Sequence, residues 1–387
     1  MLRDLTELQD NLEKYLKTTD TVYIIGHKEA DFDSIGAAVG VSQICKFYNK
    51  NSYIILDESL EDMEPGVKKV KELVKDKCNI INMDEYKEKV INNLYGEEFY
   101  SLPEDNQEEM LKISKIPKSL LIIVDTNKEY MLANKDYLRN YRRTIIIDHH
   151  KTEEKATCKA TYSYINLDAS SASEIVANYI YSKKIKIDKD VANALAAGIY
   201  LDTNRFKKNT TAVTYDAVEH LTLAGANTDT INQLFLQDFE TDKIIYNLVF
   251  DDDNTKHFIK LLKNNSVSIT LNRANPHCIY RKESIAKAAD RIQSYNSTDT
   301  AIVMGYIDPK TITISLRSNG YVDCDKLIKG YCTDKERIGG GTAKSAGAKL
   351  YNKDIIEEEE NLIEYLSQLN KKYIKRKNKN SIKPSNR

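Results

Sequence analysis

The stretch "TIIIDHH", residues 144–150, decides how the chain folds. Three consecutive isoleucines after a threonine are typical of a strand that is buried on both faces of a sheet. An aspartate and two adjacent histidines follow where the strand ends, although the chain has only six histidines in all. A polar turn would explain one such side chain, so the meaning of the pair depends on the neighbouring stretches.

Three other short apolar stretches end in the same kinds of side chain. They are "TVYIIGHKEADFD", "SLLIIVDT" and "AAGIYLDT", which begin as buried strands or a helix and finish in histidine or aspartate. In an open parallel sheet, ligands bind at the carboxyl ends of the strands. We therefore expect eight polar side chains to converge in one cleft: His27, Asp31, Asp33, Asp125, Asp148, His149, His150 and Asp202.

The order of the apolar stretches indicates the fold class. The strand "TVYII" precedes small and apolar residues at helical spacing (33–48), and the strand "NSYIILDE" follows them. Strand, helix and strand in such a short stretch predict a parallel βαβ unit. We expect residues 1–245 to form an α/β domain whose mainly parallel sheet carries helices on both faces.

The character of the sequence changes after residue 245. Residues 246–262 are interpreted as a linker, and residues 263–352 as a smaller α/β domain in which "TAIVMGYI" and "KTITISLRSN" form a β-hairpin. Residues 353–387 are expected to form a C-terminal helix with a basic tail.

The segment "RIGGGTAKSAGAKL" predicts a glycine-rich loop that leads into a helix. Backbone N–H groups at helix N-termini and in glycine-rich turns favour anions. Arg317 would give such an anion a charged partner. The alternatives are a merely flexible loop and an arginine that is solvated at the end of its strand. The residues expected to contact substrate are Arg317, Gly339, Gly340, Gly341, Thr342 and Ser171.

The clustered carboxylates indicate a metal site. Each aspartate alone could be a helix cap or a turn residue, but four or more in a small volume cannot all ionise unless cations neutralise them. Oxygen ligands with some imidazole suit Mn²⁺, Mg²⁺ or Fe²⁺. Two such ions about 3.5–4 Å apart clamp a phosphoryl group and lower the pKa of a bridging water. The sequence therefore predicts hydrolysis of a phosphoester with two divalent ions as cofactors.

Composition narrows the range of partners. Lys and Arg number 57 against 58 Asp and Glu, which excludes binding of long duplex nucleic acid by bulk charge. The six cysteines form no CxxC pair, which favours reduced thiols and a cytoplasmic location. The sequence contains no apolar run of about 18 residues, so we expect no membrane span. His220, His257 and His277 lie outside the pattern and are interpreted as ordinary.

These motifs together resemble the DHH phosphoesterase family. "GHKEADFDSIGAAVG", "IVDT", "IDHH" and "AGIYLDT" resemble its four motifs in order, and "RSNG" and "GGGTAKSAG" resemble its type 1 DHH-associated domain. The resemblance covers about residues 20–350. Within the family, the chain is most similar to the catalytic part of GdpP-type cyclic-di-AMP phosphodiesterases.

The resemblance implies a role for each site residue. One metal, usually Mn²⁺, would be held by His27, Asp31 and Asp125, and the other by Asp33, Asp125, His149 and Asp202. Asp148 would orient the site, and His150 would contact the scissile phosphate or protonate the leaving oxygen. Ser170 and Ser171 would support the site from the start of a helix.

Two residues depart from the family pattern. Ala30 replaces the usual proline before the first aspartate, and Thr342 replaces the histidine that usually follows the three glycines. A threonine hydroxyl can donate a hydrogen bond but carries no charge. Weaker substrate binding or an altered preference is therefore expected.

The resemblance implies hydrolysis of cyclic di-AMP to the linear dinucleotide pApA. One alternative keeps the fold and changes the substrate to short oligoribonucleotides or pAp. A second alternative is a nucleotide-binding sensor that has lost turnover. A manganese pyrophosphatase would share the first domain but not the glycine segment. The expected partner is a cyclic dinucleotide or a short oligonucleotide, and a homodimer is left open.

Overall fold

The computed structural model describes most of the chain and divides it into two compact units, Met1–Leu236 and Gln237–Arg387. The residues it describes are 5–56, 63–96, 102, 103, 106, 116, 118–133, 138, 140–152, 157–236, 239–250, 254–263, 265–295 and 297–380. Each unit has a sheet of its own and hydrophobic clusters of its own. The end of the expected basic tail, 381–387, lies outside the described residues.

The first unit is built on a parallel sheet of six strands in the order β3-β2-β1-β4-β5-β6. The strands are β1 (Thr21–Ile25), β2 (Asn51–Ile55), β3 (Ile80–Ile81), β4 (Ser119–Val124), β5 (Thr144–Asp148) and β6 (Tyr162–Ile165). Every neighbouring pair is parallel. The chain order reverses between β1 and β4, which makes their carboxyl ends the point where ligands are expected.

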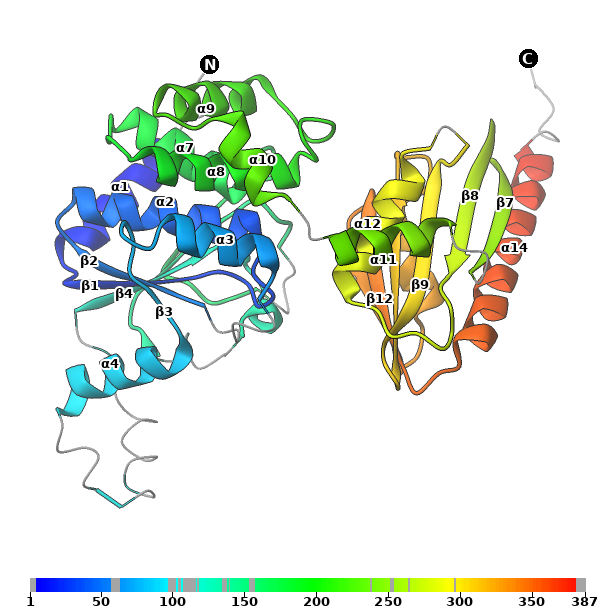
Figure 1. The fold of residues 1–387 in the computed structure, drawn as a ribbon, viewed down its shortest axis with the longest axis horizontal. Helices are drawn as coiled ribbons and strands as arrows, with labels where there is room; N and C mark the ends of the chain where they lie inside the picture. Colours follow the sequence, from blue (N-terminus) through cyan, green and yellow to red (C-terminus); the bar gives the residue numbers. More distant parts are fainter. Residues whose placement is uncertain are drawn as a thin grey trace, which may run out of the picture. The chain divides into compact units, whose positions relative to one another are not determined.

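Helices cover both faces of this sheet, as Figure 1 shows. Alternate strand residues supply the two cores: Val22 and Ile24 face one helix layer, while Tyr23 and Ile25 face the other. The helices are α1 (Thr6–Lys17), α2 (Phe32–Phe47), α3 (Pro65–Leu73), α4 (Met83–Tyr95), α7 (Ala172–Ser182), α8 (Lys189–Asp202), α9 (Ala212–Leu223) and α10 (Thr228–Leu234), with a 3₁₀ turn at Glu129–Met131. The expected α/β class, with helices on both faces, is confirmed.

The end of the first unit is fastened to the start of α2. The ring of Phe235 stacks on that of Phe32, with 4.3 Å between the ring centroids. The ammonium group of Lys69 donates to the backbone oxygens of Gln233 and Leu236. Carbonyls at a helix C-terminus have no partners within the helix, so a lysine there holds the end of α10 in place.

The second unit is a mixed sheet of six strands in the order β11-β12-β10-β9-β8-β7. The strands are β7 (Thr255–Lys263), β8 (Asn265–Arg273), β9 (Thr300–Asp308), β10 (Thr311–Ser318), β11 (Arg337–Gly341) and β12 (Ser345–Tyr351). Only the β8–β9 pair among them is parallel. The expected hairpin is formed by β9 and β10.

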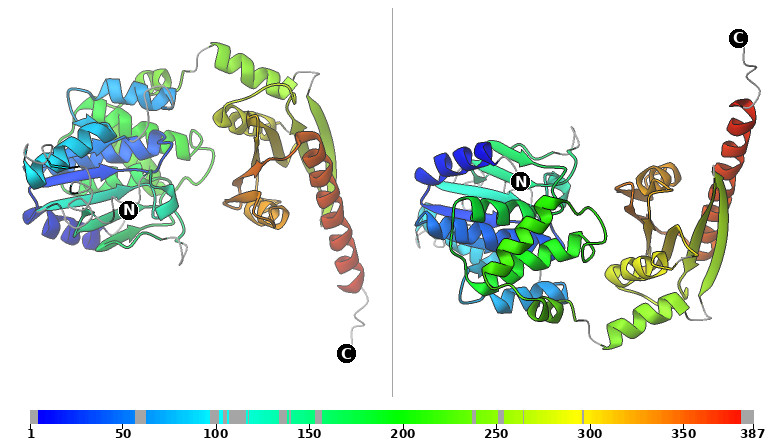
Figure 2. Two further views of the ribbon diagram at one scale, coloured as in Figure 1. Left: turned by 90° about the horizontal axis from the view of Figure 1, so that it is seen from below. Right: turned by 90° about the horizontal axis from the view of Figure 1, so that it is seen from above.

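Within the described part of the second unit, two pairs of helices pack on the sheet. Helices α11 (Phe239–Phe250) and α12 (Lys282–Gln293) share one hydrophobic cluster, and α13 (Cys324–Tyr331) and α14 (Ile355–Asn380) lie on another. Figure 2 shows α14 running beside β7. The structure therefore assigns α11 to the second unit, whereas the sequence interpretation ended the first domain at residue 245. The interpreted linker 246–262 contains most of β7.

The glycine segment forms a hairpin, so the expectation of a loop leading into a helix is wrong. Strands β11 and β12 pair directly, with Gly341 opposite Ala346. A Cβ on Gly341 would lie 2.5 Å from the backbone oxygen of Ser345 and from the Cα of Ala346. Gly341 is thus required because two strands approach each other closely there. In the sequence alone, a glycine with this role looks the same as a glycine in a flexible loop.

Helix α2 packs so closely on α8 that Gly36 has no room for a side chain. A Cβ there would lie 2.6 Å from the backbone oxygen of Ala194 and 2.9 Å from the Ser173 hydroxyl oxygen. We expect Gly36→Ala to destabilise the chain by about 1–3 kcal/mol, measured by denaturant unfolding. Gly340→Ala is the control, because its Cβ would come no closer than 3.4 Å to a neighbour. Equal stability of the two variants would contradict this packing.

Candidate metal centre

The eight polar side chains expected to converge come together at the carboxyl edge of the parallel sheet. His27 follows β1, Asp125 follows β4, and the Asp148–His150 segment ends β5. Asp202 is the last residue of α8, while Asp31 and Asp33 lie at the start of α2. The switch between β1 and β4 therefore gathers residues from five separate elements.

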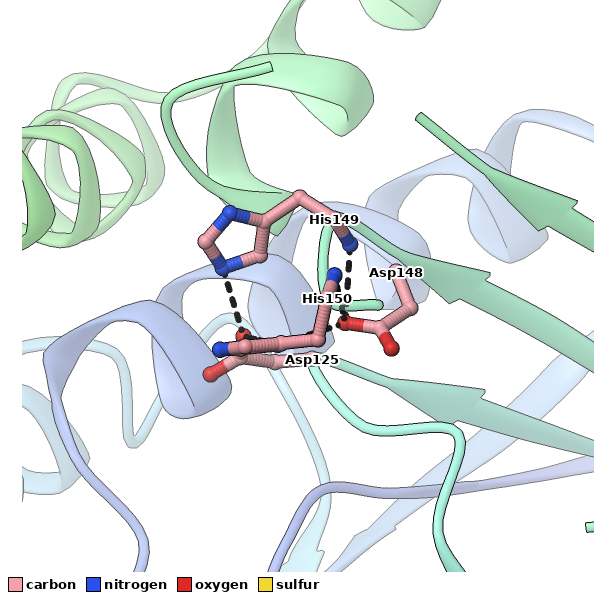
Figure 3. A group of neighbouring side chains, drawn as sticks. All are labelled: Asp125, Asp148, His149 and His150. Carbon is pink, nitrogen blue, oxygen red and sulfur yellow. Dashed lines mark hydrogen bonds and ion pairs between the residues drawn. The ribbon is translucent and has the colours of Figure 1, made fainter. Parts of the chain in front are cut away.

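Asp125 lies at the centre of the cluster. Its side chain is 3% exposed, and its two oxygens face different histidines. Oδ2 lies 3.4 Å from His27 Nε2, and Oδ1 lies 3.3 Å from His149 Nε2. Figure 3 shows the imidazole of His149 aimed at this carboxylate. Its backbone has a φ of 58°, a left-handed conformation that aspartate tolerates better than most residues.

Two sets of candidate ligands flank Asp125. His27 Nε2 lies 3.6 Å from Asp31 Oδ1, and both belong with Asp125 to one group of converging ligand atoms. His149 Nε2 lies 3.1 Å from Asp202 Oδ2 and 3.8 Å from Asp33 Oδ2, which form the second group. The ligand atoms of each group lie within 4.8 Å of one another. The first group is one of the two sets that the family resemblance implies, whereas the second lacks Asp125, which the resemblance adds to it. A third group joins Asp125 to Asp148, His149 and His150.

The donor set fits divalent ions. Asp125 Oδ1 and His149 Nε2 are buried and face each other at 3.3 Å, yet neither atom makes a hydrogen bond. Leaving a buried polar atom unpaired costs about 1–3 kcal/mol, so atoms of this kind are normally matched to a partner. Carboxylate and imidazole are both ligands of hard divalent ions, and an ion beside Asp125 would satisfy both atoms.

The electrostatics of the cluster favour bound positive charge. Burial lowers the pKa of His27 and of His149, but the carboxylates beside them outweigh burial and raise both pKa values well above 6.5. Burial and the neighbouring carboxylates Asp125 and Asp202 raise the pKa of Asp33 well above its ordinary value. Burial also raises the pKa of Asp202. Protons therefore neutralise the site when metal is absent, and metal must displace them.

Two helix N-termini hold Asp31 and Asp33. Asp31 caps α2, because its Oδ1 accepts the backbone N–H groups of Asp33 and Ser34 at 3.0 Å. Asp33 Oδ2 and Oδ1 accept the N–H groups of Ala172 and Ser173 at 2.7 and 2.8 Å. The partial positive charge of a helix N-terminus stabilises each carboxylate.

The two serines act on the site through the helix that follows them. Ser171 caps α7 by accepting the N–H of Glu174, and the Ser170 hydroxyl donates to the Glu174 carboxylate at 2.6 Å. The backbone groups that reach Asp33 belong to the next two residues along the chain. The expected substrate contact of Ser171 therefore remains a proposal.

Asp148 is fully buried behind the two histidines. Its Oδ1 accepts the backbone N–H of His149 at 2.8 Å and lies 2.9 Å from Nδ1 of His150. Its Oδ2 accepts Nδ2 of Asn127 at 2.6 Å. Sequence reasoning missed Asn127, although its place two residues after Asp125 was the available signal.

The candidate substrate residues of the second unit already have partners. Arg317 Nε donates to Asp290 Oδ1 at 2.7 Å, and the N–H of Gly341 donates to Asp325 Oδ1 at 2.9 Å. The Thr342 hydroxyl donates to the backbone oxygen of Ser345 and accepts the N–H of the same residue. The Thr342 hydroxyl is thus used within its own turn. A histidine side chain in its place would be free to reach outward.

The fold and the cluster define a two-unit α/β protein with a candidate Asp/His metal site at the edge of its parallel sheet. The chain belongs to the DHH family: "DHH family, N-terminal domain" matches residues 21–199, and "DHHA1 domain" matches residues 266–372. The resemblance inferred from the motifs is thereby confirmed. Among the described residues, no helix is long and apolar enough to cross a bilayer.

Relatives with curated names include two cyclic-di-AMP phosphodiesterases. PdeA of Listeria monocytogenes and GdpP of Bacillus subtilis are each 26% identical to this chain, over 91% of it and 48% of the relative. The chain thus spans about half the length of these relatives. A "probable bifunctional oligoribonuclease and PAP phosphatase NrnA" of Streptococcus mutans is 27% identical over 63% of the chain and 76% of the relative.

A solved structure has the same fold across both units. An exopolyphosphatase-related protein from Bacteroides fragilis aligns with a TM-score of 0.68 and 18% identity, covering 94% of this chain and 98% of that one.

We expect the metal-free chain to lose stability as the pH rises above 6.5. Because the pKa values of His27 and His149 are raised, the folded chain holds protons that the unfolded chain releases. Their contribution is complete below pH 6.5 and is lost as the pH rises through the raised values. The raised pKa values of Asp33 and Asp202 lower stability in the same direction, as the pH rises above the ordinary aspartate pKa of 3.8. The test is Tm in EDTA across this range; a Tm that is flat or rises would contradict it.

Asp125→Asn should remove most of the stabilisation that Mn²⁺ gives. An ion at 100 times its dissociation constant stabilises a protein by about 2.7 kcal/mol, and a site without the carboxylate between His27 and His149 should bind the ion more weakly. Asparagine also tolerates positive φ, so the backbone is preserved. Thermal denaturation with and without Mn²⁺ gives the measurement. Asp84→Asn, whose side chain is 95% exposed, is the control. Equal Mn²⁺ shifts in both variants would rule out the central role of Asp125.

Proposed function

We propose that the chain is a two-metal phosphodiesterase that hydrolyses cyclic di-AMP to pApA, with Mn²⁺ as the usual metal. The observation that carries the proposal is the convergence of six candidate ligand side chains, among them the buried Asp125, whose Oδ1 has no hydrogen-bond partner. Two cyclic-di-AMP phosphodiesterases match 91% of the chain, including both domains, which supports this substrate class.

We assign the ligand roles from the family resemblance, with support from the groups His27, Asp31, Asp125 and Asp33, His149, Asp202. His27, Asp31 and Asp125 would hold one ion, and Asp33, Asp125, His149 and Asp202 the other. Bound ions would supply a nucleophilic hydroxide and neutralise charge on the phosphoryl oxygens. The helix N-termini at Asp31 and Asp33 keep these carboxylates in place while substrate binds.

His150 is the residue we assign to the substrate. Its side chain is 45% exposed, whereas that of His149 is 12% exposed. Nδ1 of His150 faces Asp148, so Nε2 is left for the scissile phosphate or the leaving oxygen. Asp148 has no exposed surface and orients this imidazole.

In the second unit we assign the nucleotide to the surface made by Arg317, the glycines Gly339–Gly341 and Thr342. Arg317 and Ser345 are paired across β10 and β12, which brings the arginine next to the turn that Thr342 closes. A phosphate there would compete with Asp290 for Arg317 and with Asp325 for the Gly341 N–H. Both competitors are carboxylates, so a phosphate must displace negative charge to bind here. We therefore expect a substrate preference that differs from that of relatives with a histidine at this position.

Hydrolysis of pAp or short oligoribonucleotides is the second candidate function, favoured by the similarity to NrnA over 63% of the chain. A sensor without turnover is the third. Incubation of the purified chain with Mn²⁺ and cyclic di-AMP, cyclic di-GMP, pApA or pAp separates them. We expect cyclic di-AMP to be converted fastest and pApA to accumulate. Turnover of pAp alone would replace the leading proposal, and metal binding without any turnover would support the sensor.

Thr342→His should lower the KM for cyclic di-AMP. A histidine offers a side chain that can carry charge to a phosphate, and a charged hydrogen bond contributes about 1.5–3 kcal/mol. The expected change is roughly tenfold in KM with kcat within about twofold. Initial rates over a range of substrate concentrations measure both. Thr342→Val, which removes the turn hydroxyl without adding charge, is the control; a lower KM in that variant too would assign the effect to the turn.

A further inference from the structure

Asn127 lies directly behind His150, the residue of the first unit that we assign to the substrate. It is fully buried, two residues after Asp125. Its Nδ2 donates to Asp148 Oδ2 at 2.6 Å and to the backbone oxygen of His150 at 3.0 Å. Its own backbone oxygen accepts the N–H of Cys158 at 2.7 Å. The side-chain amide of Asn127 thus donates to both ends of the segment Asp148–His150.

These contacts determine which form of the His150 ring the site holds. Asp148 Oδ1 accepts the backbone N–H groups of His149 and His150, at 2.8 and 3.2 Å, and Asp148 Oδ2 accepts Asn127. Surrounded by donors, this carboxylate acts only as an acceptor, so Nδ1 of His150 must bring the proton to their 2.9 Å contact. Nε2 is then the ring atom that meets a ligand.

An amide suits this position better than the residues closest to it in shape. Both N–H bonds of a side-chain amide lie on one nitrogen and in one plane, so the group can donate to two acceptors at once. A carboxylate at position 127 would repel Asp148, and a leucine would offer no donor. Without Asn127, the Asp148 carboxylate could rotate about its side-chain bonds and release Nδ1 of His150.

We propose that Asn127 is a positioning residue, which fixes Asp148 and thereby the ring orientation and the Nδ1–H form of His150. The inference rests on the proposed function for its consequence in catalysis. In hydrolysis, the bond from phosphorus to the leaving ribose oxygen breaks and a bond from phosphorus to the oxygen of water forms. A proton reaches the leaving oxygen through Nε2 of His150, and the proton that water loses takes its place.

The kinetic test compares two substrates in Asn127→Leu. Cyclic di-AMP has a ribose leaving group that needs a proton, whereas bis(p-nitrophenyl) phosphate releases a stable phenolate that does not. We expect kcat for cyclic di-AMP to fall about 10- to 100-fold, with KM within about threefold, as for other partners that orient a site residue. The rate with bis(p-nitrophenyl) phosphate should stay within about threefold, because His150 gives it no proton.

Two further variants guard against loss of the fold or of metal. Asn127→Ser keeps one donor and should give an intermediate loss with cyclic di-AMP. Asn178→Leu removes another fully buried amide from the same unit, one that has no hydrogen-bond partner, and should leave the ratio of the two rates unchanged. An equal loss on both substrates, together with lower Mn²⁺ content, would overturn the proposal and assign Asn127 to the metal ligands.

A readout without turnover separates this inference from the proposed function. The ¹⁵N shifts of the histidine rings report which nitrogen carries the proton, and the chain has only six histidines. With Mg²⁺ present, His150, assigned through the His150→Gln variant, should be the Nδ1–H form in the wild type and a mixture in Asn127→Leu. Identical His150 shifts in both would overturn the positioning role. If neither phosphodiester is hydrolysed, the proposed function fails while these shifts still decide the role of Asn127.

Discussion

The buried carboxylate of Asp125 imposes the main constraint on the first unit. It has two histidines within 3.4 Å, one from each neighbouring strand end, and further carboxylates lie just beyond them. Negative charge at this density is stable only with cations or protons among it. The strand order, the left-handed backbone at Asp125 and the burial of the site all serve to bring and keep these groups together.

The scaffold supplies positive charge from its backbone as well. Asp33 is bound by the first N–H groups of α7, a helix that follows it by more than a hundred residues, and Asp31 is bound by the first turn of α2. Backbone donors move only if a helix moves, so the carboxylate positions are set by the packing of α2, α7 and α8. The absence of space at Gly36 belongs to the same arrangement.

Much of this could be predicted from the sequence, because strand ends in a parallel sheet must meet at one edge. The apolar runs before His27, Asp125 and Asp148 identified the strands, and Asp202 was found at the end of a small-residue helix. Contacts between distant segments could not be predicted: nothing local shows that Asp33 meets Ala172 or that Asn127 reaches Asp148. The glycine segment was misjudged because close strand pairing and a flexible loop both require glycine.

Phe32 lies between the ligand candidates Asp31 and Asp33, and its ring is stacked on Phe235, the residue before the first unit ends. The chain that leaves this unit is therefore tied mechanically to the turn that bears two carboxylates. The rings of Phe32 and Phe235 thus join that turn to the end of the first unit, and the ammonium group of Lys69 holds the same end from α3. The exit of the polypeptide and the geometry of the metal centre share one anchor.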